Sequence, residues 1–143
     1  MALNIFLGVC VAVVLMAILA RMNSSRKAKR MATAFAGRKP LQMEQFYERF
    51  FRERGTSFDV VKGVREILEV ELDADMSRLA DTDDFSKNLS FFWDFDSMAN
   101  VEIVCSLEKR FAITITDEEA ESTKTVGDIV ELVSRKIGTP NAV

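Results

Sequence analysis

The order of apolar and polar residues divides the chain into two unlike parts. The run from Ala2 to Ala20 is nineteen residues long and carries no charge, and about 20 apolar residues suffice to cross a bilayer core as a helix. From residue 41 onward, apolar residues recur at helical spacing between charged ones. The pattern predicts one transmembrane helix followed by an amphipathic, all-α region.

Basic residues follow the apolar run at once and predict its orientation. Arg21, Arg26 and Lys27 are the first of five basic residues between positions 21 and 30. A cleaved signal peptide carries its positive charge before a shorter apolar run, so we expect residues 1–20 to be a membrane anchor. The positive-inside rule then predicts a single-pass protein of the inner (cytoplasmic) membrane with its C-terminal domain in the cytoplasm.

Residues 21–40 form a basic juxtamembrane linker, for which two conformations are open. A flexible chain of this length spans roughly 25 Å root-mean-square. The absence of proline and glycine from Arg21 to Phe35 also allows the spanning helix to continue. In either form, the positive charges favour contact with anionic membrane lipid.

A second amphipathic helix is expected in residues 41–55. Its apolar stripe consists of Met43, Phe46, Tyr47, Phe50 and Phe51. The stripe either packs on the following domain or lies in the membrane interface with arginines at the headgroups. Packing is favoured, because an apolar stripe on a helix usually faces a core.

Residues 56–138 are predicted to form a bundle of three main helices and one short helix with a long first loop. Thr56 or Ser57 caps the first helix, which runs to about Leu72. Its buried stripe is Val60, Val61, Val64, Ile67 and Leu68. The loop from Asp73 to Phe95 is mostly polar and is anchored by Leu79, Phe85 and Leu89.

The remaining helices are predicted from caps and spacing. In DFDSMANVEIVCSLEKRF, residues 94–111, Asp96 stands at an N-cap position and Ser97 in the first turn. The apolar stripe expected there is Met98, Val101, Val104, Cys105 and Phe111. Thr116 with Glu119, and Thr125 with Asp128, are capping boxes for the short and the last helix. The last helix has the stripe Val126, Ile129, Val130, Val133 and Ile137 and precedes a tail, residues 139–143.

Charge and residue types restrict the chemistry. Residues 1–55 contain 10 Lys and Arg against 3 Asp and Glu, whereas residues 56–143 contain 9 against 19, so the acidic domain is not suited to nucleic acid. The chain has no histidine and only two cysteines, which leaves no catalytic triad and no metal site. An acid–base enzyme is the weakest hypothesis, because solvated helix faces account for the many carboxylates.

Six features in order resemble the acyl carrier protein family across roughly residues 57–137. They are Asp96-Ser97-Met98, Val101-Glu102, Glu108-Lys109-Arg110-Phe111, Ile113-Thr114-Ile115, Asp117 to Ala120, and Thr125-Val126-Gly127-Asp128. The resemblance implies that a phosphopantetheinyl transferase attaches 4′-phosphopantetheine from coenzyme A covalently to Ser97. The thiol of that arm then carries acyl or related groups as thioesters. Ser97 needs no base of its own, because the transferase and its metal ion supply the activation.

The resemblance also implies partners and an alternative. Acyl-transferring or acyl-loading enzymes, expected to be membrane-associated enzymes of lipid or secondary-metabolite synthesis, would dock around the serine. The residues expected to contact them are Asp96, Met98, Val101, Glu102, Glu108, Trp93 and Phe95. The alternative is a carrier-fold protein–protein interaction module without the arm. Of the aromatic residues before Ser97, most are expected in the core, with Trp93 as the exposed one.

Overall fold

The computed structural model describes residues 1–138, which form helices α1 to α7 and one short 3₁₀ helix. The chain divides into two compact units, Met1–Ala36 and Gly37–Val143. The tail predicted at residues 139–143 lies outside the described residues.

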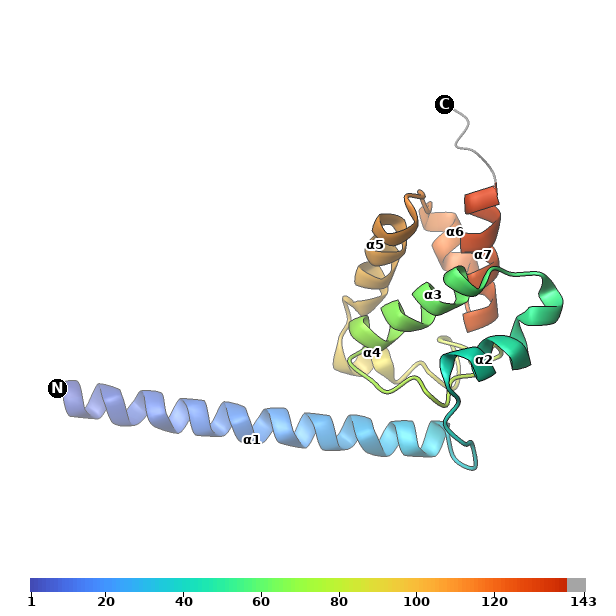
Figure 1. Cartoon of the computed structure of the whole chain (residues 1–143). Coiled ribbons are helices and arrows are strands. Elements are labelled where there is room, and N and C mark those ends of the chain that lie inside the picture. The colour runs from blue at the N-terminus through green and yellow to red at the C-terminus, as the bar shows by residue number, and fades with distance from the viewer. Residues whose placement is uncertain (139–143) are drawn as a thin grey trace. The chain divides into compact units, whose positions relative to one another are not determined.

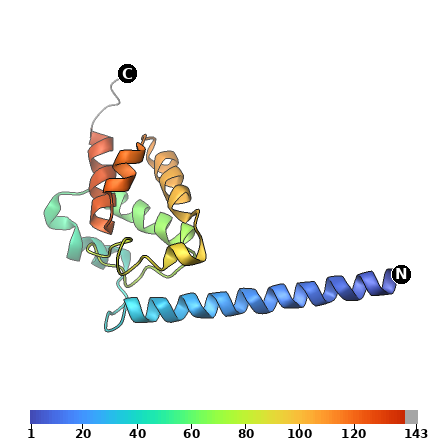
Figure 2. The same cartoon turned by 180° about the vertical axis from the view of Figure 1, so that it is seen from behind.

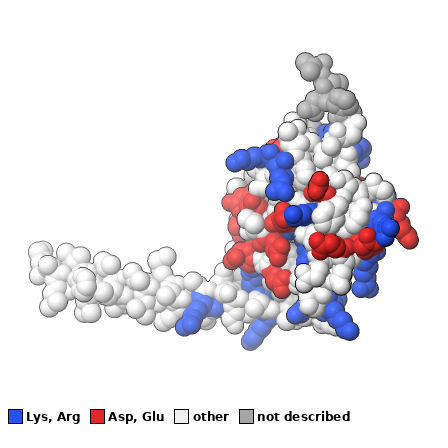
Figure 3. All heavy atoms as spheres, viewed as in Figure 1, with Lys and Arg blue, Asp and Glu red and all other residues white. Residues whose placement is uncertain are grey.

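Helix α1, Ala2–Ala34, makes up almost all of the first unit. It continues without a break through the basic segment, so the helical alternative for residues 21–34 is the one observed. Its most apolar part has a mean hydropathy of 2.8, and the helix is long and apolar enough to cross a membrane. Figure 3 shows that the apolar half of α1 carries no charged side chain and that its basic residues follow.

Four helices of the second unit form the expected bundle, which confirms the all-α fold class (Figures 1 and 2). They are α3 (Phe58–Glu71), α5 (Ala99–Phe111), the short α6 (Asp117–Ser122) and α7 (Val126–Gly138). Helix α3 packs against both α5 and α7, and α5 also packs against α7. These three helices therefore enclose one core.

The predicted stripes of α3 and α7 line this core, with one exception. All five apolar residues expected to be buried on α3 are buried. On α7, Val126, Ile129, Val130 and Val133 are buried, but Ile137 is 48% exposed. Ile137 stands in the last turn of the helix, beyond the part that packs on α3 and α5, so its assignment to the core was wrong.

The apolar stripe predicted for α5 was only partly right. Of its members, Val104 and Phe111 are half-buried, whereas Met98 and Val101 are 56% and 47% exposed and Cys105 is exposed as well. The fully buried residues of the helix are Ala99, Ile103 and Leu107. Apolar residues occupy both faces of this helix, so spacing alone fits either face. The face with Ala99, Ile103 and Leu107 packs inward, whereas Met98, Val101 and Cys105 are left to solvent.

The amphipathic segment before the bundle packs on it, as favoured from the sequence. Helix α2 spans Met43–Phe50, and the 3₁₀ helix η1 spans Arg52–Arg54. Phe46 and Phe51 are completely buried. The guanidinium of Arg65 on α3 lies 5.1 Å from the centre of the Phe46 ring, and burial lowers the pKa of Arg65. Residues 37–55 are thus part of the second unit.

The long loop between α3 and α5 is pinned as expected and contains an unpredicted turn of helix. Its anchors Leu79, Phe85 and Leu89 are all buried. Helix α4, Phe92–Phe95, forms directly before the Asp-Ser pair. Both predicted capping boxes are present: Thr116 with Glu119 before α6, and Thr125 with Asp128 before α7.

Candidate functional site

Ser97 lies exposed in the turn that joins α4 to α5. The Asp96 carboxylate accepts a hydrogen bond from the backbone N–H of Met98, two residues on, at 2.9 Å, as in an Asx turn. Asp96 was predicted to be the N-cap of the helix, but the N-cap of α5 is Met98 and no side chain caps this helix. The regular helix nevertheless begins only at Ala99. Ser97 therefore precedes the helix and does not stand in its first turn as predicted, because Ser97 and Met98 form the turn that leads into it.

The beginning of α5 offers a favourable place for a negatively charged group. Backbone N–H groups at the start of a helix point away from it and form the positive end of its dipole. Glu102 is the acidic residue of this first turn, and Lys109 and Arg110 stand in the last turn. In Figure 3, acidic side chains gather around α4 and the beginning of α5, and basic ones at its other end.

The two predicted docking glutamates of α5 have different surroundings. Glu102 is exposed, as are Met98 and Val101 beside it. The carboxylate of Glu108 instead accepts a hydrogen bond from the backbone N–H of Ile115 at 2.7 Å. Glu108 is therefore engaged in fixing the connection between α5 and α6.

Of the aromatic residues before Ser97, only Trp93 is more buried than predicted. Phe91 and Phe92 are buried, and Phe95 is half-buried. Trp93, expected to be the exposed one, is also only half-buried. Its indole N–H donates a hydrogen bond to the carbonyl oxygen of Phe85 at 3.0 Å, and the two rings lie 5.6 Å apart between centres. This pairing holds Trp93 against the bundle.

A cavity of about 200 Å³ lies beside Trp93 among α5, α6 and α7. Its walls include Phe85 and Trp93 from the loop side, Ile103 and Leu107 from α5, and Leu132 from α7. Asn100 and Thr123 add polar groups to its lining. The sequence analysis did not predict this cavity, because its lining residues come from five separate segments and share no local pattern.

Titratable groups do not converge on this cavity. Among residues 1–138, no three His, Cys, Asp or Glu side chains are placed to hold a metal ion. Glu121 is the one carboxylate in the described lining. Cys105 is exposed on α5. The candidate site thus comprises an exposed serine and a mainly apolar cavity, whose lining includes Trp93 and Asn100 from either side of Ser97 in the sequence.

Comparison with known proteins places this arrangement in a family. Residues 60–133, just over half of the chain, match the PP-binding family model, described as a phosphopantetheine attachment site. The acyl carrier protein of Phenylobacterium zucineum is 38% identical over 80 residues, which cover 56% of this chain and 96% of the relative.

Two further relatives agree. The acyl carrier protein of Caulobacter vibrioides is 37% identical over 78 residues, covering 54% of this chain and 95% of its own. The acyl carrier protein of Thermosynechococcus vestitus is 30% identical over 79 residues, which cover 55% of this chain and 93% of the relative. Members of this family carry covalently attached 4′-phosphopantetheine, which is accordingly the cofactor of this chain. The chain belongs to the phosphopantetheine-binding acyl carrier protein family.

Proposed function

We propose that Ser97 is the residue to which the 4′-phosphopantetheine arm is attached. The observation that carries this proposal is an exposed serine in the turn before α5, inside the matched segment 60–133. A hydroxyl in an exposed turn can enter the active site of a transferase without local unfolding. The start of α5 also suits the phosphodiester that would join the arm to the serine.

The surrounding residues support a carrier and not an enzyme. When bound, the arm supplies a thiol that holds an acyl group as a thioester. Trp93 and Asn100, which flank Ser97 in sequence, both line the cavity, so a flexible chain attached at Ser97 starts close to its walls. Ile103, Leu107 and Leu132 offer apolar surface to an acyl chain. Carrying acyl groups in this way requires no catalytic residue in this chain.

Exposed residues beside Ser97 would contact the partner enzymes. Phosphopantetheinyl transferases and acyl-handling enzymes are partners of acyl carrier proteins in general. Met98 and Val101 present apolar surface next to the serine, and Glu102 adds a negative charge. Apolar contact supplies affinity at such a surface, while charge guides the encounter. Asp96, Trp93 and Phe95, which precede Ser97 directly, would border this surface, whereas Glu108 stands near the other end of α5 and is engaged with Ile115.

The first unit would anchor the carrier in the inner membrane. The apolar run in α1 crosses the bilayer once, and the basic residues from Arg21 onward stay on the cytoplasmic side with the carrier domain. The partners would then be membrane-associated enzymes of lipid or secondary-metabolite synthesis, because an anchored carrier meets enzymes of its own membrane at high effective concentration.

Intact-mass measurement tests the attachment. The full chain is produced with a phosphopantetheinyl transferase and coenzyme A, and we expect the mass to rise by one 4′-phosphopantetheinyl group. Ser97→Ala should abolish this rise, whereas Ser122→Ala, which changes an exposed serine of α6, should leave it unchanged. A wild-type chain that stays unmodified would favour an interaction module that kept the carrier fold and lost the arm.

Protease treatment tests the topology separately. Protease added to spheroplasts should leave residues 56–143 intact and should digest them only after the membrane is opened. Digestion from outside would place the domain on the other side of the membrane, without bearing on the attachment at Ser97.

A further inference from the structure

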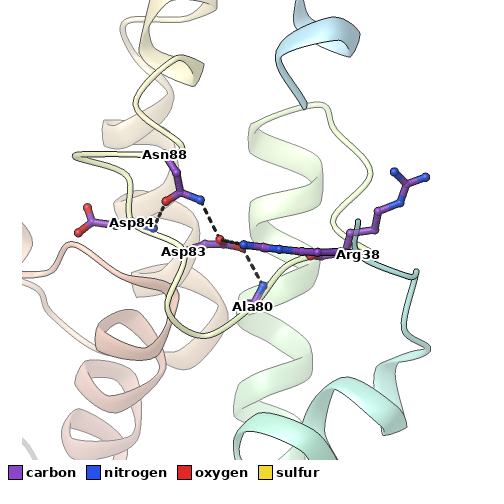
Figure 4. Close-up of polar contacts among 6 residues, drawn as sticks. Arg38, Ala80, Asp83, Asp84 and Asn88 are labelled. Atoms are coloured by element: carbon purple, nitrogen blue, oxygen red, sulfur yellow. Dashed lines mark hydrogen bonds and ion pairs between the residues drawn. The ribbon is translucent and has the colours of Figure 1, made fainter. Parts of the chain in front are cut away.

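Asp83 is a buried carboxylate whose two oxygens accept hydrogen bonds from three different residues. It is 1% exposed and accepts hydrogen bonds from both terminal nitrogens of Arg38 at 2.7 and 2.8 Å. The Ala80 N–H and the Asn88 amide donate to it at 2.8 Å each. Figure 4 shows Asp83 between Arg38 on one side and Asn88 on the other. Pairing with Asp83 raises the pKa of Arg38.

Arg38 comes from outside the segment that matches the family. It precedes residues 60–133, whereas Asp83 lies within them. The backbone next to Arg38 is also attached to the bundle, because the Leu41 N–H donates to the carbonyl oxygen of Ser77 at 2.7 Å and Arg65 donates to the Leu41 carbonyl at 3.0 Å. This chain therefore adds its own support to the loop that contains Asp83.

Asp83 and Phe85, two residues later, are both held by backbone hydrogen bonds to the residues around the start of α7. The Asp83 carbonyl accepts a hydrogen bond from Val126 N–H at 3.0 Å, and Phe85 N–H donates to Lys124 at 2.9 Å. Asn88 links the two parts of the loop, since its amide oxygen accepts from Asp84 N–H at 2.9 Å. The backbone from Asp83 to Phe85 is thus hydrogen-bonded to the residues around the start of α7.

Phe85 in turn positions Trp93. The Phe85 carbonyl receives the indole N–H, and the Phe85 ring lies against the indole. Both rings form the loop side of the cavity. A continuous set of direct contacts therefore runs from Arg38 through Asp83 and Phe85 to the wall of the cavity.

We propose that Arg38 is a positioning residue for this wall: by pairing with Asp83 it fixes Phe85 and Trp93, and so sets which acyl chains the cavity shelters. The acyl part of this inference rests on the proposed function, whereas the positioning of Trp93 does not. Removing Arg38 should loosen the loop without detaching it, because the backbone hydrogen bonds of the loop to Lys124 and Val126 remain.

Trp93 is the only tryptophan of the chain, so its fluorescence reports on the wall directly. The experiment uses the full chain without the arm, in detergent micelles, and measures acrylamide quenching. Arg38→Gln should raise the quenching constant about twofold, as expected for a half-buried ring that becomes accessible. Arg38→Lys, which keeps the charge, should recover part of the protection. Arg52→Gln is the matched control, because Arg52 pairs with Glu48 at an exposed site.

A second variant covers the case in which Arg38→Gln leaves Asp83 too unfavourably buried to fold. Combining Arg38→Gln with Asp83→Asn removes both charges and keeps two hydrogen-bonding amides. Circular dichroism is used to check that this double variant is folded, and its quenching should still exceed that of the wild type. Wild-type quenching in a folded Arg38→Gln chain, or in the folded double variant, would overturn the positioning role.

A second experiment tests the effect on acyl groups. The arm is loaded with acyl groups of increasing length, from acetyl to palmitoyl, and the rate at which hydroxylamine cleaves each thioester is measured. In the wild type we expect slower cleavage of chains that enter the cavity than of the acetyl form. Arg38→Gln should reduce this difference and leave the acetyl rate unchanged; an unaltered chain-length profile would overturn the role in selectivity. If no arm can be attached to Ser97, the proposed function fails, while the quenching result still decides the positioning of Trp93.

Discussion

Gly63 of α3 faces the ring of Phe111 of α5 so closely that a β-carbon on Gly63 would lie 2.6 Å from the ring's terminal carbon. Real side chains essentially never approach to that distance. The absence of a side chain at Gly63 thus allows α3 and α5 to pack at their observed separation, and α5 is the helix that follows Ser97.

Gly63→Ala should therefore destabilise the bundle. Alanine gains roughly 0.5–1 kcal/mol over glycine within a helix, but overpacking a core costs about 1–3 kcal/mol, so the net free energy of unfolding should fall. Urea denaturation of the full chain measures it. Replacing Phe111 by alanine in the same chain should remove most of the penalty, and a Gly63→Ala chain as stable as the wild type would contradict the close packing.

Acid should weaken the loop before α4. The Asp84 carboxylate accepts hydrogen bonds from the hydroxyl and backbone N–H of Ser86 at 2.6 and 2.7 Å, and the hydroxyl contact is the main reason that its pKa is lowered. A lowered native pKa gives stability that is present above the unfolded-state pKa and is lost as the pH falls through the native value.

Asp84→Asn should therefore flatten the decline in unfolding free energy below about pH 5. Thermal melts at a series of pH values measure this slope. Glu118→Gln, an exposed carboxylate of α6, serves as the control and should leave the slope close to that of the wild type. An equally steep decline in Asp84→Asn would show that this carboxylate does not contribute.

Ile103→Ala should lower the free energy of unfolding and enlarge the cavity. Ile103 is 6% exposed and lines the cavity, and truncating a buried isoleucine to alanine costs about 2–5 kcal/mol. A longer acyl chain on the arm should then restore part of the melting temperature, because a group that fills the space stabilises the folded state. Equal losses in the loaded and unloaded forms would show that the chain does not enter this cavity.

Val101→Ser should impair partner contact while leaving the fold intact. Val101 is 47% exposed on α5, and a substitution at such a position usually changes stability by less than about 0.5 kcal/mol. We expect a lower kcat/KM for the transferase that modifies the chain. Val70→Ser is the matched control, because Val70 is 73% exposed on α3. Equal effects of the two variants would remove Val101 from the contact surface.

Local patterns in the sequence predicted the helices well, because each helix has its own caps and spacing. Both capping boxes and the stripe of α3 depend only on residues within a few positions of one another. The buried face of α5 could not be predicted in this way, since the helix itself carries apolar residues on more than one face. Choosing between Met98 and Ile103 requires knowing where α3 and α7 lie.

The site was predicted only where a motif carried it. The motif Asp96-Ser97-Met98 identified the exposed serine. Helix α5 begins at Ala99, two residues later than predicted, so Ser97 precedes the helix. The ion pair of Arg38 with Asp83 joins residues 45 positions apart, and neither residue stands in a helix or a motif. Long-range contacts of this kind depend on the folded arrangement and leave no periodic signal.

The unbroken course of α1 gives the basic segment a constant length. With the apolar run in the membrane, as proposed, residues 21–34 extend the helix by about 21 Å at 1.5 Å per residue. A disordered chain of the same fourteen residues would have a root-mean-square length of roughly 20 Å, but it would also sample much shorter and longer lengths. The typical length is thus almost the same for both, whereas the helix holds it at one value. The end of α1, from which the carrier domain continues, would therefore stay at one distance along the helix from the apolar run, where a disordered tether would let it fold back onto the lipid.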